Sequence, residues 1–205
     1  YIKKKYNNSY DLDKKFILKF KKINFYYIYL NSRKIYLPRE NIKETSIISP
    51  LGNYGKNKFK TEDFLKKKIK KKLVSLRISN IIGRRKYNNK RNTHKLFLDN
   101  FLKYRKDKKK IIINNDFKDF LSINQFSRII YKIIKLKISG IYNVSISQKI
   151  YVSEIVKWLD KDFFKRVSFI ETCKDSFTLS NKKLQKKIKI NISKNQLKLF
   201  CKKLI

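Results

Sequence analysis

The feature that most constrains the fold is an alternation of short apolar runs with longer segments of helical periodicity. The predominantly apolar runs lie at 25–30, 73–79 and 140–144, and the first is continuous rather than alternating. Continuous runs of this length are typical of strands that are buried on both faces of a parallel sheet. Segments 11–22 and 123–135 instead carry apolar residues at helical spacing. The alternation therefore predicts an α/β fold with a parallel sheet.

The same patterns predict the remaining elements. Further helices are expected at 54–69, from Thr93 to about Lys103, at 152–159, and in two short segments near Leu184 and Leu199. Further strands are expected at 111–113 and 167–170. Segments 80–92 and 117–122 are expected to be a basic loop and a connector.

The net charge is the most unusual bulk property of the chain. Its 205 residues are 41% hydrophobic, but they carry a net charge of +39. Such a charge attracts polyanions, so a basic nucleic-acid-binding protein of ribosomal type is our second hypothesis. A dedicated binder would concentrate cations and stacking aromatics on one surface. The lysines are instead spread along every predicted helix and loop, so we expect only weak, non-specific nucleic-acid binding.

Composition also bears on the compartment and on the extent of the chain. Cys173 and Cys201 form no metal-binding pattern and favour a reducing compartment. No apolar run approaches the ~18 residues of a membrane span, and no signal-peptide pattern opens the chain. We therefore expect a cytoplasmic protein without a metal or a membrane partner. Because the chain starts at Tyr1 and has no methionine, we expect a fragment or a processed product.

Several polar residues are expected at one edge of the sheet. Ser32 follows the first predicted strand, and Asn80 lies at the end of the second. Tyr54 and Lys58 are four residues apart in the helix between them, so they share one helix face. Ligands of parallel α/β sheets bind beyond the carboxyl ends of the strands. A tyrosine beside an ammonium group is a candidate for proton transfer, because a nearby cation lowers the pKa of the phenol.

Ordered segments along the chain resemble a known family. They are 30–36 (Leu-Asn-Ser-Arg-Lys-Ile-Tyr), 54–58 (Tyr-Gly-Lys-Asn-Lys), 76–80 (Leu-Arg-Ile-Ser-Asn), 119–123 (Asp-Phe-Leu-Ser-Ile), 139–144 (Ser-Gly-Ile-Tyr-Asn-Val) and 179–184 (Leu-Ser-Asn-Lys-Lys-Leu). In this order they are similar to motifs of the extended short-chain dehydrogenase/reductase family of NAD-dependent nucleotide-sugar epimerases, dehydratases and reductases. The resemblance implies the C-terminal part of a Rossmann-like parallel sheet with a small α/β substrate-binding lobe.

The resemblance also implies a role for each matching residue. Tyr54 would be the acid/base, and Lys58 would hold the nicotinamide ribose of NAD or NADP and lower the pKa of Tyr54. Ser32 would hydrogen-bond the reacting oxygen of the sugar, and Asn80 would contact the nucleotide-sugar substrate. The substrate diphosphate would face basic residues near the mouth of the site, namely Arg84, Arg85, Arg91 and Lys118.

The resemblance further implies two regions within the chain. Residues 1–83 and 113–144 would form a partial NAD(P)-binding domain, and residues 84–112 and 145–205 would form the substrate-binding lobe. The helix that carries Tyr54 would offer a surface for pairing as a homodimer. The Gly-rich phosphate turn of the family has no counterpart among the four glycines, which implies a fragment without the dinucleotide-binding half. A non-catalytic remnant of the fold is therefore a third hypothesis.

Overall fold

The computed structural model describes residue 5 and residues 11–20, 24–84, 97–106 and 111–205. In chain order the elements are α1 (Leu12–Lys19), β1 (Tyr27–Ser32), the 3-10 turn η2 (Arg33–Ile35), α2 (Asn53–Ile69), η3 (Lys70–Lys72), β2 (Leu73–Ile78), β3 (Asn80–Ile82), α3 (Phe97–Lys106), β4 (Ile111–Asn114), β5 (Phe117–Lys118), β6 (Phe120–Ser122), α4 (Ile123–Leu136), β7 (Gly140–Val144), β8 (Ile150–Tyr151), α5 (Val152–Leu159), α6 (Lys161–Phe164), β9 (Val167–Ile170), α7 (Lys182–Ile188) and α8 (Lys194–Lys202).

A three-stranded parallel sheet forms the centre of the molecule, with the strand order β1–β2–β7. The middle strand, β2, is buried from Leu73 to Arg77. Even its polar residues Ser75 and Arg77 are buried, because both faces of a central parallel strand are covered. The predicted α/β fold with a parallel sheet is confirmed.

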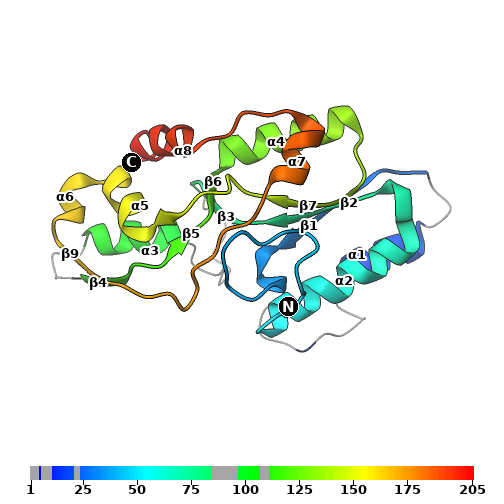
Figure 1. Ribbon diagram of the computed structural model, residues 1–205, viewed down its shortest axis with the longest axis horizontal. Helices are drawn as coiled ribbons and strands as arrows, with labels where there is room; N and C mark the ends of the chain where they lie inside the picture. Colours follow the sequence, from blue (N-terminus) through cyan, green and yellow to red (C-terminus); the bar gives the residue numbers. More distant parts are fainter. Residues whose placement is uncertain (1–4, 6–10, 21–23, 85–96, 107–110) are drawn as a thin grey trace.

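Helices cover both faces of this sheet (Figure 1). On one face α2 packs against β1 and β2, with α1 alongside it, and the buried contacts join Ile17, Tyr29 and Leu65. On the other face lie α4 and α7, and Ile129 and Leu184 belong to the largest hydrophobic cluster of the described residues. The helices take their positions from the apolar face that each presents to the sheet.

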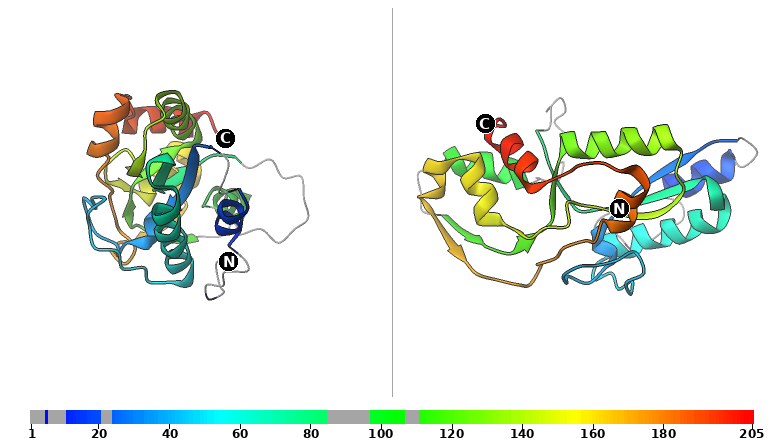
Figure 2. Two further views of the ribbon diagram at one scale, coloured as in Figure 1. Left: turned by 90° about the vertical axis from the view of Figure 1, so that its right-hand side faces the viewer. Right: turned by 45° about the horizontal axis from the view of Figure 1, so that its top comes forward.

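The remaining elements gather at the end of the molecule opposite α1 and α2 (Figures 1 and 2). They form three two-stranded sheets, β3–β6 and β4–β9 in parallel and β5–β8 in antiparallel pairing. Helix α5 packs against α6 and α8, and Phe101 of α3 meets Phe163 of α6 edge-on at 5.1 Å between ring centroids. This second group continues the main core around the end of the central sheet.

Most predicted elements are present, and two segments differ from the prediction. The expected loop at 80–92 begins with strand β3, which pairs with β6, so Asn80 lies in a strand. The expected connector at 117–122 contains β5 and β6. Strands of two or three residues are too short to show a period of two in the sequence. Thr93, the expected helix cap, lies outside the described residues.

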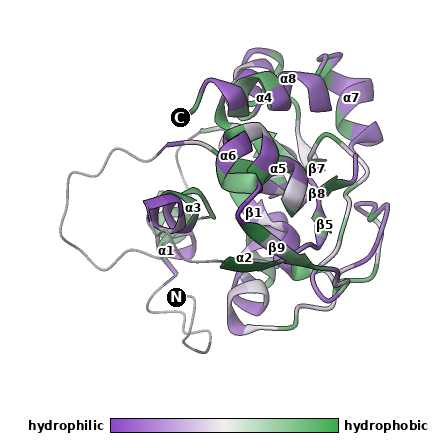
Figure 3. Cartoon of the chain, turned by 90° about the vertical axis from the view of Figure 1, so that its left-hand side faces the viewer, coloured by the Kyte–Doolittle hydropathy of each residue, from purple (hydrophilic) through white to green (hydrophobic). Residues whose placement is uncertain are grey.

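Hydrophilic residues colour most of α7 and α8, whereas short strands such as β9 are hydrophobic (Figure 3). This distribution matches lysines on solvated helix faces around an apolar interior. Among the residues that the structure describes, we find no helix with the length and hydrophobicity needed to cross a membrane.

Candidate functional site

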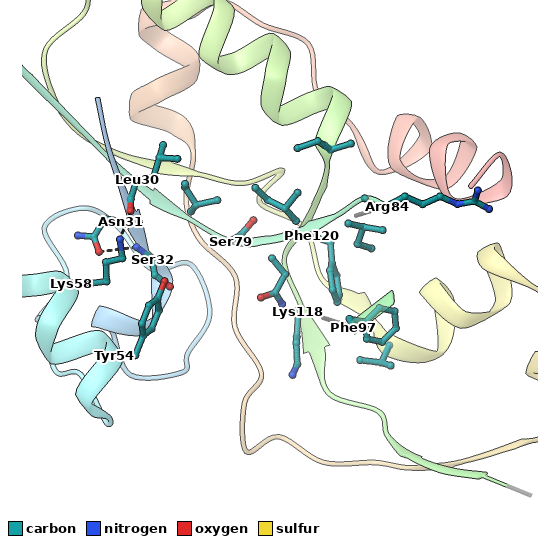
Figure 4. Close-up of a pocket in the computed structure, with 17 residues that line it drawn as sticks. Leu30, Asn31, Ser32, Tyr54, Lys58, Ser79, Arg84, Phe97, Lys118 and Phe120 are labelled. Atoms are coloured by element: carbon teal, nitrogen blue, oxygen red, sulfur yellow. Dashed lines mark hydrogen bonds between the residues drawn. The ribbon is translucent and has the colours of Figure 1, made fainter. Parts of the chain in front are cut away.

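A pocket of about 840 Å³ lies at the carboxyl ends of β1 and β2 (Figure 4). Six of the eight predicted site residues line it, namely Ser32, Tyr54, Lys58, Asn80, Arg84 and Lys118. The other two, Arg85 and Arg91, lie outside the described residues. The position matches the rule that ligands of open α/β sheets bind where the strands end.

Ser32 and Tyr54 face each other across one side of the pocket (Figure 4), and the Ser32 side chain acts to lower the pKa of Tyr54. Tyr54 stands in the first turn of α2, directly before Gly55. A Cβ atom at Gly55 would lie 2.2 Å from the carbonyl oxygen of Lys34 and 2.9 Å from the Cβ of Pro50. The glycine therefore permits the close approach of α2 to η2 that brings Tyr54 to Ser32.

The backbone around Ser32 is fixed by short-range hydrogen bonds. The Ser32 N–H donates to Oδ1 of Asn31 at 2.7 Å, and Oγ of Ser32 accepts from the N–H of Lys34 at 3.2 Å. The second bond caps η2, which begins directly after β1. Ser32 thus acts as the junction between the strand and the turn, with its side chain held at the pocket wall.

Lys58 lies one turn along α2 from Tyr54 and is also anchored. Its Nζ donates to the carbonyl oxygen of Leu30 at 2.8 Å and lies 4.8 Å from the ring centroid of Tyr29. Burial lowers the pKa of Lys58, and the carboxylates of Asp13 and Asp11 oppose that shift. The ammonium group is therefore held against β1 at the edge of the pocket.

The pKa of Tyr54 corrects one expectation from the sequence. The expected influence of Lys58 was a lower phenol pKa, but in the structure the pKa of Tyr54 is raised. Burial is the largest cause, and the hydrogen bond from Ser32 only opposes it. Tyr54 is therefore a protonated phenol at neutral pH, ready to donate rather than to accept a proton.

A buried polar network lies behind Ser32 and was not found by sequence reasoning. Glu62 of α2 forms an ion pair with Arg77 of β2, and both side chains are almost fully buried. Glu62 Oε2 also accepts from Nδ2 of Asn31 at 2.7 Å and from Oγ of Ser75. Because Asn31 also bonds the N–H of Ser32, the network links the ion pair to the site.

The network extends to the strand on the far side of β2. Arg77 donates to the Tyr36 hydroxyl and, at 2.9 Å, to the carbonyl oxygen of Glu44. Tyr36 in turn donates to Oδ1 of Asn143 in β7 at 3.3 Å. One signal in the sequence could have indicated this buried network. Glu62 lies four residues after Lys58 on the same helix face, and a buried carboxylate requires a partner.

Lys118 stands across the pocket from Tyr54 (Figure 4), where its Nζ lies 3.1 Å from Oδ2 of Asp175 and 3.8 Å from Asp116. Asp175 also forms ion pairs with Arg33 and Lys34, which follow Ser32 in the chain. Sequence reasoning missed this cluster, because Asp175 is 142 residues from Arg33.

The remaining predicted residues contribute less to the pocket chemistry. The Asn80 N–H donates to the carbonyl oxygen of Asp119 at 3.2 Å, which reflects its place in β3. Arg84 extends away from Ser32 and Tyr54 (Figure 4). Within the described part of the chain, no group of three or more His, Cys, Asp and Glu side chains is arranged to hold a metal ion.

These features define a class of fold. A parallel sheet covered by helices on both faces, with a pocket at its carboxyl edge and a smaller α/β group beside it, is the Rossmann-like fold of the nucleotide-sugar epimerases and dehydratases. No protein-family model and no curated protein matches the chain.

Solved structures with this fold can be named individually. UDP-N-acetylglucosamine 4-epimerase from Methanobrevibacter ruminantium M1, in complex with UDP-N-acetylmuramic acid, aligns over 96% of this chain and 67% of its own with a TM-score of 0.76 and 17% identity. dTDP-glucose 4,6-dehydratase from Bacillus anthracis, in complex with NAD, aligns over 93% and 63% with a TM-score of 0.72 and 14% identity. UDP-glucose 4-epimerase from Thermotoga maritima, with UDP-glucose, aligns over 92% and 65% with a TM-score of 0.71 and 16% identity. The chain thus spans about two thirds of the length of these proteins.

Proposed function

We propose that the protein is an NAD(P)-dependent enzyme acting on a nucleotide sugar, of the epimerase, dehydratase or reductase type. The observation that carries the proposal is that Ser32 and Tyr54 face each other in a pocket that Lys58 also lines. A hydroxyl pair of this kind suits proton transfer at a sugar oxygen. The proteins with this fold that are named above bind UDP-sugars or NAD.

The residues present fit the nicotinamide-ribose end of the cofactor. The Lys58 ammonium, held on the Leu30 carbonyl at the pocket edge, offers donors to ribose hydroxyls. When bound, NAD(P) supplies the acceptor or donor of a hydride. We assign residues 1–83 and 113–144 to the cofactor side and residues 84–112 and 145–205 to the substrate side.

The chain's own side chains would carry the proton. Tyr54 would donate its phenolic proton to the sugar oxygen in the reductive direction, and Ser32 would hold that oxygen by a hydrogen bond. The raised pKa of Tyr54 favours this direction. Withdrawal of a proton by Tyr54 requires a cation beside it, and Lys58, on the same face of α2 and in the same pocket lining, is the candidate for that role.

The test is turnover of nucleotide sugars with NAD(P)(H), followed by the absorbance of the reduced nicotinamide. Tyr54→Phe is expected to lower turnover by at least about a hundredfold, because general acid–base catalysis contributes on the order of 10²–10⁴. Tyr131→Phe is the matched control, since Tyr131 is 63% exposed on α4 and away from the pocket. Equal turnover in wild type and Tyr54→Phe would refute the mechanism.

A further inference from the structure

Three cationic side chains converge on the carboxylate of Asp175. Nη2 of Arg33 lies 2.6 and 2.7 Å from its two oxygens. Nζ of Lys34 lies 3.0 Å from Oδ1, and Nζ of Lys118 lies 3.1 Å from Oδ2. The cations come from η2 and β5, and the carboxylate comes from the segment after β9. We call Arg33, Lys34 and Lys118 the cation cluster.

The cation cluster is built into the fold and carries excess positive charge. The Arg33 side chain is 4% exposed and its guanidinium stacks 3.9 Å from the ring centroid of Phe177. Asp116, 3.8 Å from Lys118, is the second carboxylate beside it. Three cations therefore face two carboxylates. A rigid, stacked guanidinium is well suited to hold a planar carboxylate.

The cation cluster adjoins the proposed proton-transfer residues. Oγ of Ser32 accepts from the backbone N–H of Lys34, and the same side chain faces Tyr54 in the pocket. Lys118 lines the pocket opposite Tyr54. An anion held between Lys34 and Lys118 would therefore border the pocket on the side that Lys118 lines. Because Ser32 and Tyr54 are proposed to bind the reacting sugar oxygen, a group beside them would belong to the sugar ring rather than to the more distant diphosphate.

Asp175 is the part of this arrangement that can leave. Its side chain is 33% exposed and it lies in a turn, whereas Arg33 is fixed by burial. Its segment has other anchors, since Thr172 donates to Oδ1 of Asp116 at 2.6 Å. A rotation of the Asp175 side chain would open the cluster without undoing that anchor.

We propose that the cation cluster is a subsite for a carboxylate on the sugar ring of the substrate. In this proposal Asp175 is an internal competitor, and the substrate carboxylate displaces it from the cluster. The inference rests on the proposed function and narrows its substrate to an acidic nucleotide sugar. It gives Lys34 and Lys118 a role in specificity and gives Asp175 a role in tuning affinity.

The test compares three probes by isothermal titration calorimetry with the full chain: UDP, UDP-glucose and UDP-glucuronate. The two sugars differ only in the oxidation of C6 to a carboxylate. Wild type is expected to bind UDP-glucuronate about tenfold more tightly than UDP-glucose, because hydrogen bonds to charged groups are strong. Lys34→Gln is expected to abolish this preference and leave UDP binding unchanged. Lys67→Gln, on the exposed Lys67–Asp63 pair, is the control that should retain the preference.

Asp175→Asn provides the second arm. It is expected to tighten UDP-glucuronate binding by at least about threefold, since removing a competitor raises the fraction of open sites, and to leave UDP-glucose unchanged. Equal affinities of wild type for the two sugars would overturn the inference. Loss of UDP binding in Lys34→Gln would also overturn it, by assigning the cluster to the diphosphate. If UDP and UDP-glucose bind without an acidic preference, only this inference fails. If none of the three probes binds, the proposed function fails as well.

Discussion

Loss of the Glu62 carboxylate should destabilise the fold strongly. Its carboxylate and Arg77 are both buried, and removing one partner of a buried pair leaves an uncompensated charge. We expect Glu62→Gln to lower the free energy of unfolding by roughly 3 kcal/mol, measured by urea denaturation. Asp63→Asn is the control on the same helix, because its pair with Lys67 is exposed and such pairs contribute about 0.5 kcal/mol or less. Similar losses in both variants would contradict the assignment.

Asp175 should make stability depend on acid. The cations Arg33, Lys34 and Lys118 hold the pKa of Asp175 below its ordinary value against the effect of burial, and Asp116 is the other carboxylate beside the cluster. A carboxylate with a depressed pKa stabilises the fold above its unfolded pKa of about 3.9, and this contribution is lost as the pH falls further. The difference in unfolding free energy between wild type and Asp175→Asn should be constant above about pH 5 and shrink below about pH 4. Parallel stability curves down to acid pH would contradict this.

At the scale of the elements, the contact of α2 with η2 decides whether the site forms. Gly55→Ala would place a methyl group against the Lys34 carbonyl and Pro50. We expect a loss of about 1–3 kcal/mol in unfolding free energy, as for overpacking, together with lower turnover because Tyr54 shifts from Ser32. Gly52→Ala is the matched control, since no atom lies within 4 Å of the added Cβ. An effect of equal size at Gly52 would refute the steric argument.

The elements also show what a sequence can and cannot reveal. The central strands and α2 were predictable, because their apolar runs and helical periods extend over enough residues to be recognised. The pocket position followed from the rule for strand ends, which brought Ser32 and Tyr54 together. Strands β5 and β6 were missed because they are too short to show a period. The Arg33–Asp175 pair was missed because tertiary contacts between distant residues leave no local pattern.

At the scale of the whole molecule, a net charge of +39 should produce non-specific attraction to polyanions. We expect a single-stranded DNA oligonucleotide to bind only at low salt, with an affinity that falls steeply and log-linearly as salt rises and with no sequence preference. Fluorescence anisotropy across a salt series measures this. Tight, sequence-selective binding at physiological salt would instead favour a nucleic-acid-binding function.

The buried Glu62–Arg77 pair has a consequence for how this protein can evolve. A mutation of either residue alone leaves a stranded charge, whereas replacing both by apolar residues of similar size can be nearly neutral. The two positions should therefore be inherited as a unit, kept together or lost together. The lysines on the solvated helix faces have no such constraint. Surface positions around this pair can therefore accept substitutions freely. Sequence similarity between related proteins would persist at the buried pair long after it is lost at the surface.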